Sequence, residues 1–319
     1  MLKKVLIARP LPEGVVAEAR KHFSVDVRKD TKPMSQDEMQ SALRDYDGVM
    51  PTLGDMFQPA IFAGVDEPRC RILANFGVGY NHIDAVAANA AGLTITNTPG
   101  AVTDATADIA MTLMLMSARR AGEGERLVRS GAWQGWHPTQ MLGLHLSGKT
   151  VGIVGMGRIG KAIAQRCHFG FGMKVAYVSR SSKTLPFEAQ SFQSLIDMAA
   201  TVDVIAVAVP GGAQTHHLIN ADVFMAMQPH AHLINISRGD VVDEAALITA
   251  LSTGQIGGAG LDVYEFEPVV PQALKGLENV VLLPHLGTAA LEVRSDMGLM
   301  AVANLKAFLV DGLAPPNAI

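Results

Sequence analysis

The chain has 319 residues, of which 49% are apolar and 18% are charged, so it can bury sizeable cores and is too apolar to be disordered. Its 26 Lys and Arg residues and 30 Asp and Glu residues give a net charge of -4, which argues against a nucleic-acid partner because that partner needs a basic surface. The sequence shows neither a basic patch suited to a membrane surface nor an apolar run near the roughly 20 residues of a membrane span.

The first hundred residues alternate short β-rich runs with helical patterns. Strands are predicted at Lys4–Ala8, Gly48–Met50, Arg71–Asn75 and Leu93–Thr96, and helices at Glu13–His22 and Gln36–Arg44. Strands separated by helix-length segments predict βαβ units and a parallel sheet. The first apolar run spans only four residues before Arg9-Pro10, too short for an export signal. The chain also has only two cysteines, Cys70 and Cys167, and they lie far apart in the sequence. The short apolar run and the isolated cysteines together indicate a reducing, cytoplasmic location.

A helix is predicted over about Thr103–Arg120, and a second series of strands follows it. The six predicted strands are Thr150–Val154, Val175–Val178, Asp203–Val209, His232–Ile236, Gly258–Leu261 and Val280–Leu283. Continuous apolar runs suit strands covered on both faces, and a six-stranded parallel sheet is typical of a dinucleotide-binding domain. A long final helix, Leu291 to Asp311, is expected to return to the N-terminal domain.

We therefore expect an α/β protein with two Rossmann-like or flavodoxin-like domains, each a doubly wound parallel sheet, and a cleft between them. Residues 1–99 and 288–319 are predicted to form a discontinuous substrate domain, also called the catalytic domain. Residues 100–287 are predicted to form the dinucleotide-binding Rossmann domain.

A glycine-rich loop follows the predicted strand Thr150–Val154 and opens a predicted helix from Arg158 to Cys167. It reads Gly155-Met156-Gly157-Arg158-Ile159-Gly160. The three glycines serve a tight turn, close approach of a pyrophosphate and close helix–strand packing, and the helix N-terminus favours the anion. We expect Gly155, Gly157, Arg158, Ile159 and Gly160 to contact a dinucleotide.

The end of the next strand tests which dinucleotide is preferred. NAD enzymes usually carry Asp or Glu there, whereas this chain has Ser179-Arg180-Ser181-Ser182-Lys183. A carboxylate about 4 Å from a 2′-phosphate would cost about 4 kcal/mol at an effective dielectric near 20, roughly a thousandfold in affinity. Arg180 instead suits a phosphate, flanked by the hydroxyls of Ser179 and Ser181. NADP(H) is therefore the predicted cofactor, with NAD(H) as a second possibility.

Reduction of a 2-keto acid by such a cofactor needs a cation for the carboxylate, a proton donor at the keto oxygen, and a group that keeps the donor charged. Histidine suits the donor, and a nearby carboxylate favours its protonated form. Arg238, an acid at Glu265 or Glu267, and His285 each follow one of three successive predicted strands. Open α/β sheets bind ligands at these strand ends, so the three residues are predicted to be catalytic. Spacing alone does not choose between the two acids.

From about Asp47 to its end, the sequence resembles the D-isomer-specific 2-hydroxyacid dehydrogenases, most densely from Thr150 to Thr288. The motifs are Asn75-Phe76-Gly77-Val78-Gly79-Tyr80-Asn81-His82-Ile83-Asp84, Thr106-Ala107-Asp108, the glycine loop, Asn235-Ile236-Ser237-Arg238-Gly239, Gly258-Ala259-Gly260-Leu261-Asp262-Val263, Glu267-Pro268 and Pro284-His285. The glyoxylate/hydroxypyruvate reductase branch is the most similar, partly through Ser179-Arg180-Ser181.

The resemblance implies roles for individual residues. Glu267 would pair with His285, and Arg238 would bind the keto acid, together with backbone N–H groups of Val78 and Gly79. The cofactor would be contacted by Thr106, Pro210, Thr215, Ile236, Asp262 and Gly287 in addition to the glycine loop. The Val209-Pro210-Gly211-Gly212 segment departs from relatives, which often carry a leucine–threonine segment there.

The resemblance also implies a homodimer that acts on a small 2-keto or 2-hydroxy acid. Trp136, in Gly131-Ala132-Trp133-Gln134-Gly135-Trp136, matches a segment that reaches the partner subunit's active site in this branch, and Leu53 would line the substrate pocket. Trp133 is equally compatible with aromatic packing in a dimer interface. The predicted activity is NADPH-preferring reduction of glyoxylate or hydroxypyruvate to the D-2-hydroxy acid, with hydride from the nicotinamide and a proton from His285.

Other functions fit the sequence less well. His230-x-His232 and His216-His217 could suggest a metal, but no third suitable ligand stands nearby in the sequence, so no metal is expected. A different D-2-hydroxyacid dehydrogenase, such as phosphoglycerate dehydrogenase, is the alternative enzyme. A corepressor-like protein that senses dinucleotides without catalysis is the alternative from another class. A formate dehydrogenase is disfavoured because Glu267 supplies an ionisable partner for proton transfer.

Overall fold

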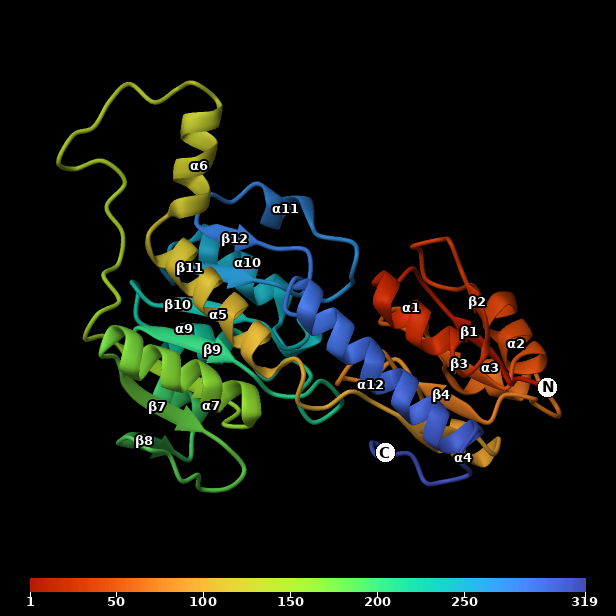
Figure 1. The fold of residues 1–319 in the computed structure, drawn as a ribbon. Helices are drawn as coiled ribbons and strands as arrows, with labels where there is room; N and C mark the ends of the chain where they lie inside the picture. The colour runs from red at the N-terminus through yellow and green to blue at the C-terminus, as the bar shows by residue number, and fades with distance from the viewer. The chain divides into compact units, whose positions relative to one another are not determined.

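The computed structural model describes residues 1–319 and divides them into two compact units. Unit 1 comprises Met1–Val102 and Ala289–Ile319, and unit 2 comprises Thr103–Thr288. Each unit is an α/β fold built on one parallel β-sheet (Figure 1), as the sequence predicts. None of the helices combines the length and the apolar character needed to cross a lipid bilayer.

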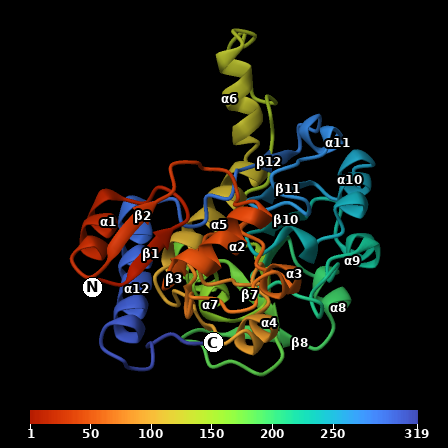
Figure 2. The same ribbon diagram turned by 90° about the vertical axis from the view of Figure 1, so that its right-hand side faces the viewer.

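The sheet of unit 1 has five parallel strands in the order β2-β1-β3-β4-β5, the flavodoxin-like order. These strands are β1 (Lys4–Ile7), β2 (Ser24–Val27), β3 (Gly48–Met50), β4 (Ile72–Ala74) and β5 (Thr94–Thr96). The helices are α1 (Glu13–Arg20), α2 (Gln36–Asp45), α3 (Pro59–Ala63), α4 (Ala85–Ala90) and α12 (Leu291–Leu309). The C-terminal helix α12 packs beside α1 and against β3 and β4, as the two views show (Figure 2).

A buried ion pair fixes one strand-end loop of unit 1. Arg9 donates to both carboxylate oxygens of Asp55, at 2.9 and 3.0 Å, and the Asp55 side chain is fully buried. The same carboxylate accepts hydrogen bonds from the backbone N–H groups of Met34 and Thr52. Because every partner of Asp55 is in place, the loop that carries Leu53 is held rigidly.

The sheet of unit 2 has seven parallel strands in the order β12-β11-β10-β9-β6-β7-β8. The strands are β6 (Thr150–Val154), β7 (Lys174–Val178), β8 (Ala189–Phe192), β9 (Val204–Val207), β10 (His232–Asn235), β11 (Gly258–Leu261) and β12 (Val280–Leu282). The chain starts at β6, extends to β7 and β8, and then returns to β9 on the other side of β6. This reversal is that of a Rossmann fold, and it creates a switch point between β6 and β9.

Helices cover both faces of this sheet. The helices of unit 2 are α5 (Thr103–Ala118), α6 (Ala121–Arg129), α7 (Arg158–Gln165), α8 (Leu195–Ala199), α9 (Ala221–Ala226), α10 (Glu244–Ser252) and α11 (Gln272–Lys275), with a π-helical turn η1 (Arg166–Gly170) and a 3-10 turn η2 (Gly239–Val241). Helix α6 is the one that does not lie on the sheet. Helix α5 packs against α7, β10 and β11 (Figure 1). Two apolar clusters lie on the two faces of the sheet.

The predicted six-stranded sheet was wrong by one strand, because β8 pairs with β7 at the edge. The sequence of β8, Ala-Gln-Ser-Phe, is polar in the middle and has no fully buried residue, so it carries no apolar run. The helix predicted to reach Cys167 ends its α-helical part at Gln165 and continues as η1. Burial raises the pKa of the Cys167 thiol to about 12, so this cysteine is an inert core residue.

A buried hydrogen bond joins β10 to α5. The Ser117 hydroxyl and Nδ1 of His232 form a hydrogen bond of 2.7 Å, and burial lowers the pKa of His232 to about 4, with the charge of His230 adding to the shift. His232 therefore stays neutral in the folded protein at a pH where it is protonated in the unfolded chain.

We expect His232 to make the protein sensitive to acid. As the pH falls from 6.5 towards about 4, the unfolded chain takes up a proton that the folded chain refuses, so stability drops by up to about 3 kcal/mol. His232→Asn keeps an acceptor for Ser117 but cannot be protonated. Urea unfolding at about pH 7 and about pH 4.5 should show a smaller acid loss in this variant. An equal loss in both proteins would exclude His232 as the cause.

Candidate active site

The glycine loop between β6 and α7 has the steric properties that a dinucleotide requires. Gly155 has a φ of 97°, and a Cβ there would lie 2.7 Å from the carbonyl oxygen of Ala208. A Cβ on Gly160 would lie 2.1 Å from the carbonyl oxygen of Gly155, so α7 packs directly on the turn. Gly157, the N-cap of α7, instead faces open space. The residues present thus fit a pyrophosphate at the start of α7, where Arg158 and Ile159 begin the helix.

The segment after β7 places polar and basic groups at the end of the second strand. Arg180 and Ser181 are exposed, and Ser179 is half-buried. The ammonium group of Lys183 donates to the Ser181 hydroxyl at 2.7 Å, while the backbone N–H of Lys183 donates to the Tyr177 hydroxyl at 3.2 Å. Arg180 and Lys183 make the local charge positive, which is compatible with the 2′-phosphate of NADP(H). A positive charge here does not exclude NAD(H).

The side chains of His285 and Glu267 meet beyond the ends of β12 and β11. His285 Nδ1 lies 2.9 Å from Glu267 Oε2, and about a third of each side chain is exposed. The other carboxylate oxygen of Glu267 accepts from the backbone N–H of Tyr264 at 3.0 Å. With Nδ1 occupied by this carboxylate, Nε2 is the ring nitrogen that remains for a substrate.

Two opposing effects set the charge of Glu267. Burial raises the pKa of its carboxyl, but the hydrogen bond and charge of His285, the N–H of Tyr264 and the charge of Arg238 together bring that pKa below its usual value. The carboxylate therefore stays ionised through neutral and mildly acidic pH. An ionised carboxylate beside an imidazole stabilises the imidazolium form.

Arg238 lies in the turn between β10 and η2 and is partly buried. One guanidinium nitrogen donates to the carbonyl oxygen of Ser237 at 2.7 Å. Asn235 fixes the turn by donating to the carbonyl oxygen of Arg238 and accepting from Ser237, at 2.9 and 3.0 Å. Burial lowers the pKa of the guanidinium, against the charges of Glu267 and Asp240, but an arginine remains a cation at any physiological pH.

Gly211, in the loop after β9, lies against the side chain of Arg238. A Cβ on Gly211 would lie 2.7 Å from Cγ of Arg238, so a larger residue would displace the arginine stem. In the same loop, the Thr215 hydroxyl donates to the carbonyl oxygen of Pro210 at 2.8 Å.

Asp262 and Tyr264 hold the backbone that carries His285. Both oxygens of Asp262 accept backbone N–H groups, from Leu286 at 2.6 Å and from Gly287 at 2.8 Å, and its carbonyl oxygen accepts the N–H of His285. Burial raises the pKa of the Asp262 carboxyl. The sequence analysis missed Tyr264, whose hydroxyl donates to the carbonyl oxygen of Leu283 at 2.9 Å.

The remaining predicted contacts in unit 2 lie close to this backbone. Ile236 is buried at the end of β10, and the Thr106 hydroxyl, on α5, donates to the carbonyl oxygen of Gly287 at 3.2 Å. These groups therefore border the same strand ends as Arg238 and His285.

Val78, Gly79 and Leu53 belong to unit 1. The carbonyl oxygen of Val78 accepts from Asn97, and that of Gly79 accepts from Asn75. Leu53 is 39% exposed.

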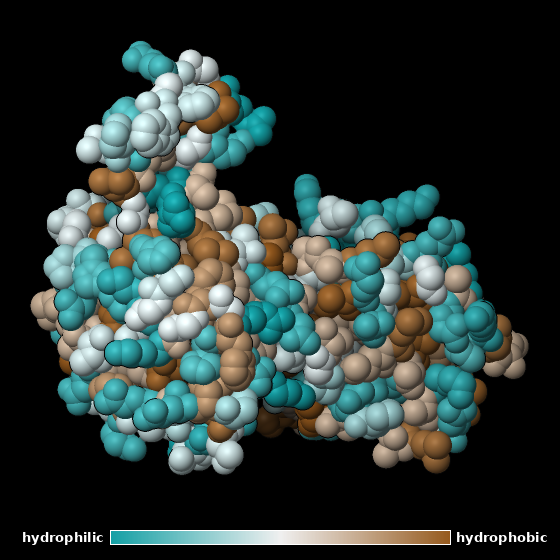
Figure 3. All heavy atoms as spheres, turned by 60° about the vertical axis from the view of Figure 1, so that its left-hand side comes forward, coloured by the Kyte–Doolittle hydropathy of each residue, from teal (hydrophilic) through white to brown (hydrophobic).

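Trp133 and Trp136 lie in an arm formed by α6 and the irregular residues 130–149 that follow it. Helix α6 has no buried residue, and Trp136 is 78% exposed and Trp133 50% exposed. The arm stands away from the rest of unit 2, with apolar side chains among polar ones (Figure 3). Sequence analysis did not predict α6, because a helix without a buried face carries no core pattern.

Comparison with known proteins decides the family. A model described as the NAD-binding domain of D-isomer-specific 2-hydroxyacid dehydrogenases matches residues 111–287. A glyoxylate reductase from Thermococcus kodakarensis is 42% identical over 100% of this chain and 96% of the relative. This chain therefore belongs to the D-isomer-specific 2-hydroxyacid dehydrogenase family. It is an NAD(P)-dependent dehydrogenase, in agreement with the activity that the sequence predicts.

Solved structures of this family share its fold along the whole chain. A putative D-isomer-specific 2-hydroxyacid dehydrogenase from Polaromonas has a TM-score of 0.93 with 34% identity, covering 100% of both chains. An NADPH-dependent glyoxylate/hydroxypyruvate reductase from Sinorhizobium meliloti, solved with NADP and malonate, has a TM-score of 0.88 with 37% identity, covering 100% of this chain and 97% of that chain.

Proposed function

We propose that this dehydrogenase reduces small 2-keto acids, glyoxylate and hydroxypyruvate above all, to D-2-hydroxy acids. The observation that carries the proposal is the 2.9 Å contact between His285 and Glu267, beside the partly buried cation Arg238. These are the proton donor, its charged partner and the carboxylate anchor that the reaction needs. The names of the relatives, glyoxylate reductases among them, support the choice of substrate.

Each residue of the proposed site has its own role in substrate binding or proton transfer. Arg238 binds the keto acid carboxylate, with the N–H groups of Val78 and Gly79 as further donors. His285 donates the proton from Nε2 to the keto oxygen, and Glu267 stabilises the imidazolium before that transfer. Bound NADPH supplies the hydride. Ile236, Asp262 and Thr106 would hold the nicotinamide end of the cofactor, with Pro210, Thr215 and Gly287 beside it.

A panel of 2-keto acids tests this function. Initial rates with glyoxylate, hydroxypyruvate, pyruvate and a phosphorylated hydroxypyruvate, each with NADPH and NADH, should give the highest kcat/KM for the first two acids with NADPH. A higher value for the phosphorylated acid would favour the phosphoglycerate dehydrogenase alternative. No turnover with any acid, despite cofactor binding, would favour a non-catalytic dinucleotide sensor.

The preference for NADPH rests on Arg180 and its neighbours. We expect Arg180→Gln to lower kcat/KM for NADPH by about ten- to a hundredfold, because one charge-assisted hydrogen bond to the 2′-phosphate is lost. The value for NADH, which lacks this phosphate, should remain almost unchanged. Lys174→Gln, a change of an exposed lysine at the start of β7, provides the matched control. Equal losses with both cofactors would contradict the assignment.

A homodimer belongs to the same proposal, with a cytoplasmic location. The arm of α6 and residues 130–149 offers Val128, Trp133, Trp136 and Leu142 as exposed apolar side chains, an unusual number for a free surface segment. Sedimentation equilibrium should give twice the chain mass of 33.8 kDa. Trp136→Ala should raise KM for the keto acid if this side chain serves a partner's active site. A monomer with full activity would contradict the dimer.

A further inference from the structure

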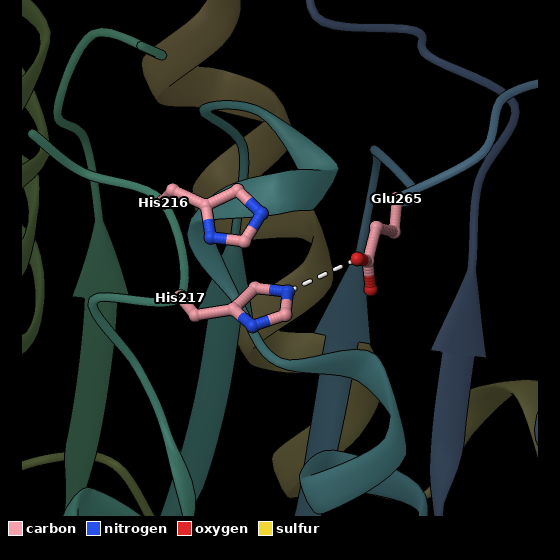
Figure 4. A group of neighbouring side chains, drawn as sticks. All are labelled: His216, His217 and Glu265. Carbon is pink, nitrogen blue, oxygen red and sulfur yellow. Dashed lines mark hydrogen bonds and ion pairs between the residues drawn. The ribbon is translucent and has the colours of Figure 1, made fainter. Parts of the chain in front are cut away.

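A second cluster of side chains that could bind a ligand lies in unit 2, outside the groups assigned to catalysis. It consists of His216 and His217, in the loop after β9, and Glu265, in the segment after β11 (Figure 4). One ligand atom from each residue lies within 4.8 Å of the other two. Sequence analysis set the histidine pair aside for want of a third ligand, and the fold supplies that ligand from 48 positions further along the chain.

The backbone turns both imidazoles to the same side. Consecutive side chains of an extended chain point in opposite directions, but His217 has a φ of 48°, in the left-handed region that few non-glycine residues adopt. As a result the rings of His216 and His217 stack, with centroids 3.9 Å apart and planes inclined by 26°. The backbone N–H of His217 donates to the carbonyl oxygen of Asp240 at 2.8 Å and holds this conformation.

Two of the three side chains are already in place. His217 Nε2 lies 3.0 Å from Glu265 Oε1, and only 15% of the Glu265 side chain is exposed. His216 is exposed and its only ring contact is the stack on His217, so its ring can turn towards the pair by giving up that stack.

The geometry points to a binding site for one divalent transition-metal ion of the zinc type, held by His216, His217 and Glu265. Bonds of about 2.0–2.2 Å in a tetrahedral arrangement place ligand atoms roughly 3.3–3.5 Å apart. The His217–Glu265 distance of 3.0 Å needs only a small increase, and rotation of His216 closes the remaining gap. Two imidazoles and a carboxylate favour zinc, cobalt, nickel or copper over magnesium or calcium, which prefer oxygen ligands alone. Water would take the fourth position.

An ion at this site would connect two strand-end loops of unit 2, and a third loop packs against them. His216 and His217 follow β9, and Glu265 follows β11. The loop after β10 is tied in as well, because a Cβ on Gly239 would lie 1.8 Å from the backbone of Tyr264. The bound ion should therefore raise the resistance of the protein to unfolding, since it binds the folded state only.

Cobalt(II) provides a probe with a visible spectrum that depends on coordination. Titration of the untagged full-length protein should reveal one saturable site with absorption typical of four-coordinate cobalt. His216→Asn, His217→Asn and Glu265→Gln should each weaken binding by more than about tenfold. His22→Asn is the matched control, because it removes another His–Glu pair, with Glu18 at 3.2 Å, that has no second imidazole.

Thermal unfolding supplies a readout that is independent of spectroscopy and of the reductase activity. Zinc should raise the Tm of the unaltered protein and of His22→Asn, but not that of His217→Asn. His216→Asn alters only an exposed side chain, so it tests the site even if His217→Asn unfolds. Absence of saturable cobalt binding, or equal affinity in the unaltered protein and His216→Asn, would overturn the proposal.

Discussion

His285→Gln should lower kcat for keto acid reduction by about 10²–10⁴-fold, the contribution of a positioned general acid. Glutamine can hydrogen-bond within the site but cannot deliver a proton from an imidazolium. The glycine loop and the segment after β7 are untouched, so the affinity for NADPH, measured by the fluorescence of the bound cofactor, should change little. Turnover close to that of the unaltered enzyme would refute the role of His285 as proton donor.

Glu267→Gln is the companion to this variant. The carboxylate is ionised because hydrogen bonds and charges outweigh the effect of burial on its pKa. Removal of its charge withdraws the support for a protonated imidazole, so kcat for keto acid reduction should fall by about tenfold or more, while the affinity for NADPH should change little. The loss should be smaller than in His285→Gln, because the imidazole is still present. An unchanged kcat would exclude Glu267 as the partner of the proton donor.

The elements that the sequence predicts well are those whose signal is local. Continuous apolar runs place β6 and β11 at Thr150–Val154 and Gly258–Leu261, the same bounds as in the structure. Glycine spacing likewise predicts the loop at the start of α7, because a side chain at Gly155 or Gly160 would collide with nearby backbone atoms. Edge strands are different. Strand β2 alternates exposed and half-buried residues, and without an apolar run it escaped prediction.

Side-chain partners that depend on the fold could not be read from spacing. Glu265 and Glu267 both follow β11, two residues apart, and sequence reasoning alone left either of them as the partner of His285. In the structure Glu267 contacts His285 and Glu265 contacts His217. The backbone N–H of Tyr264 donates to Glu267 and helps to hold its carboxylate beside His285. Such a contact has no signature in the sequence beyond the motif itself.

Arg238→Gln should lower kcat/KM for the keto acid by about 10²–10³-fold, because loss of a partly buried cation that binds an anion costs several kcal/mol. The stem of Arg238 occupies the space that Gly211 leaves free, so the guanidinium has a fixed direction. Arg238→Lys keeps the charge but not the planar fork, and it should recover only part of the loss.

The two arginine variants also report on Glu267. The charge of Arg238 helps to lower the pKa of that carboxyl, so Arg238→Gln should raise it while Arg238→Lys should largely preserve it. Activity in the glutamine variant should therefore decline at a higher pH on the acidic side, in addition to the lower kcat/KM. Arg69→Gln, which removes an exposed arginine paired with Asp47 in unit 1, controls for loss of a positive charge. If Arg69→Gln and Arg238→Gln reduce kcat/KM equally, the substrate carboxylate is not bound by Arg238.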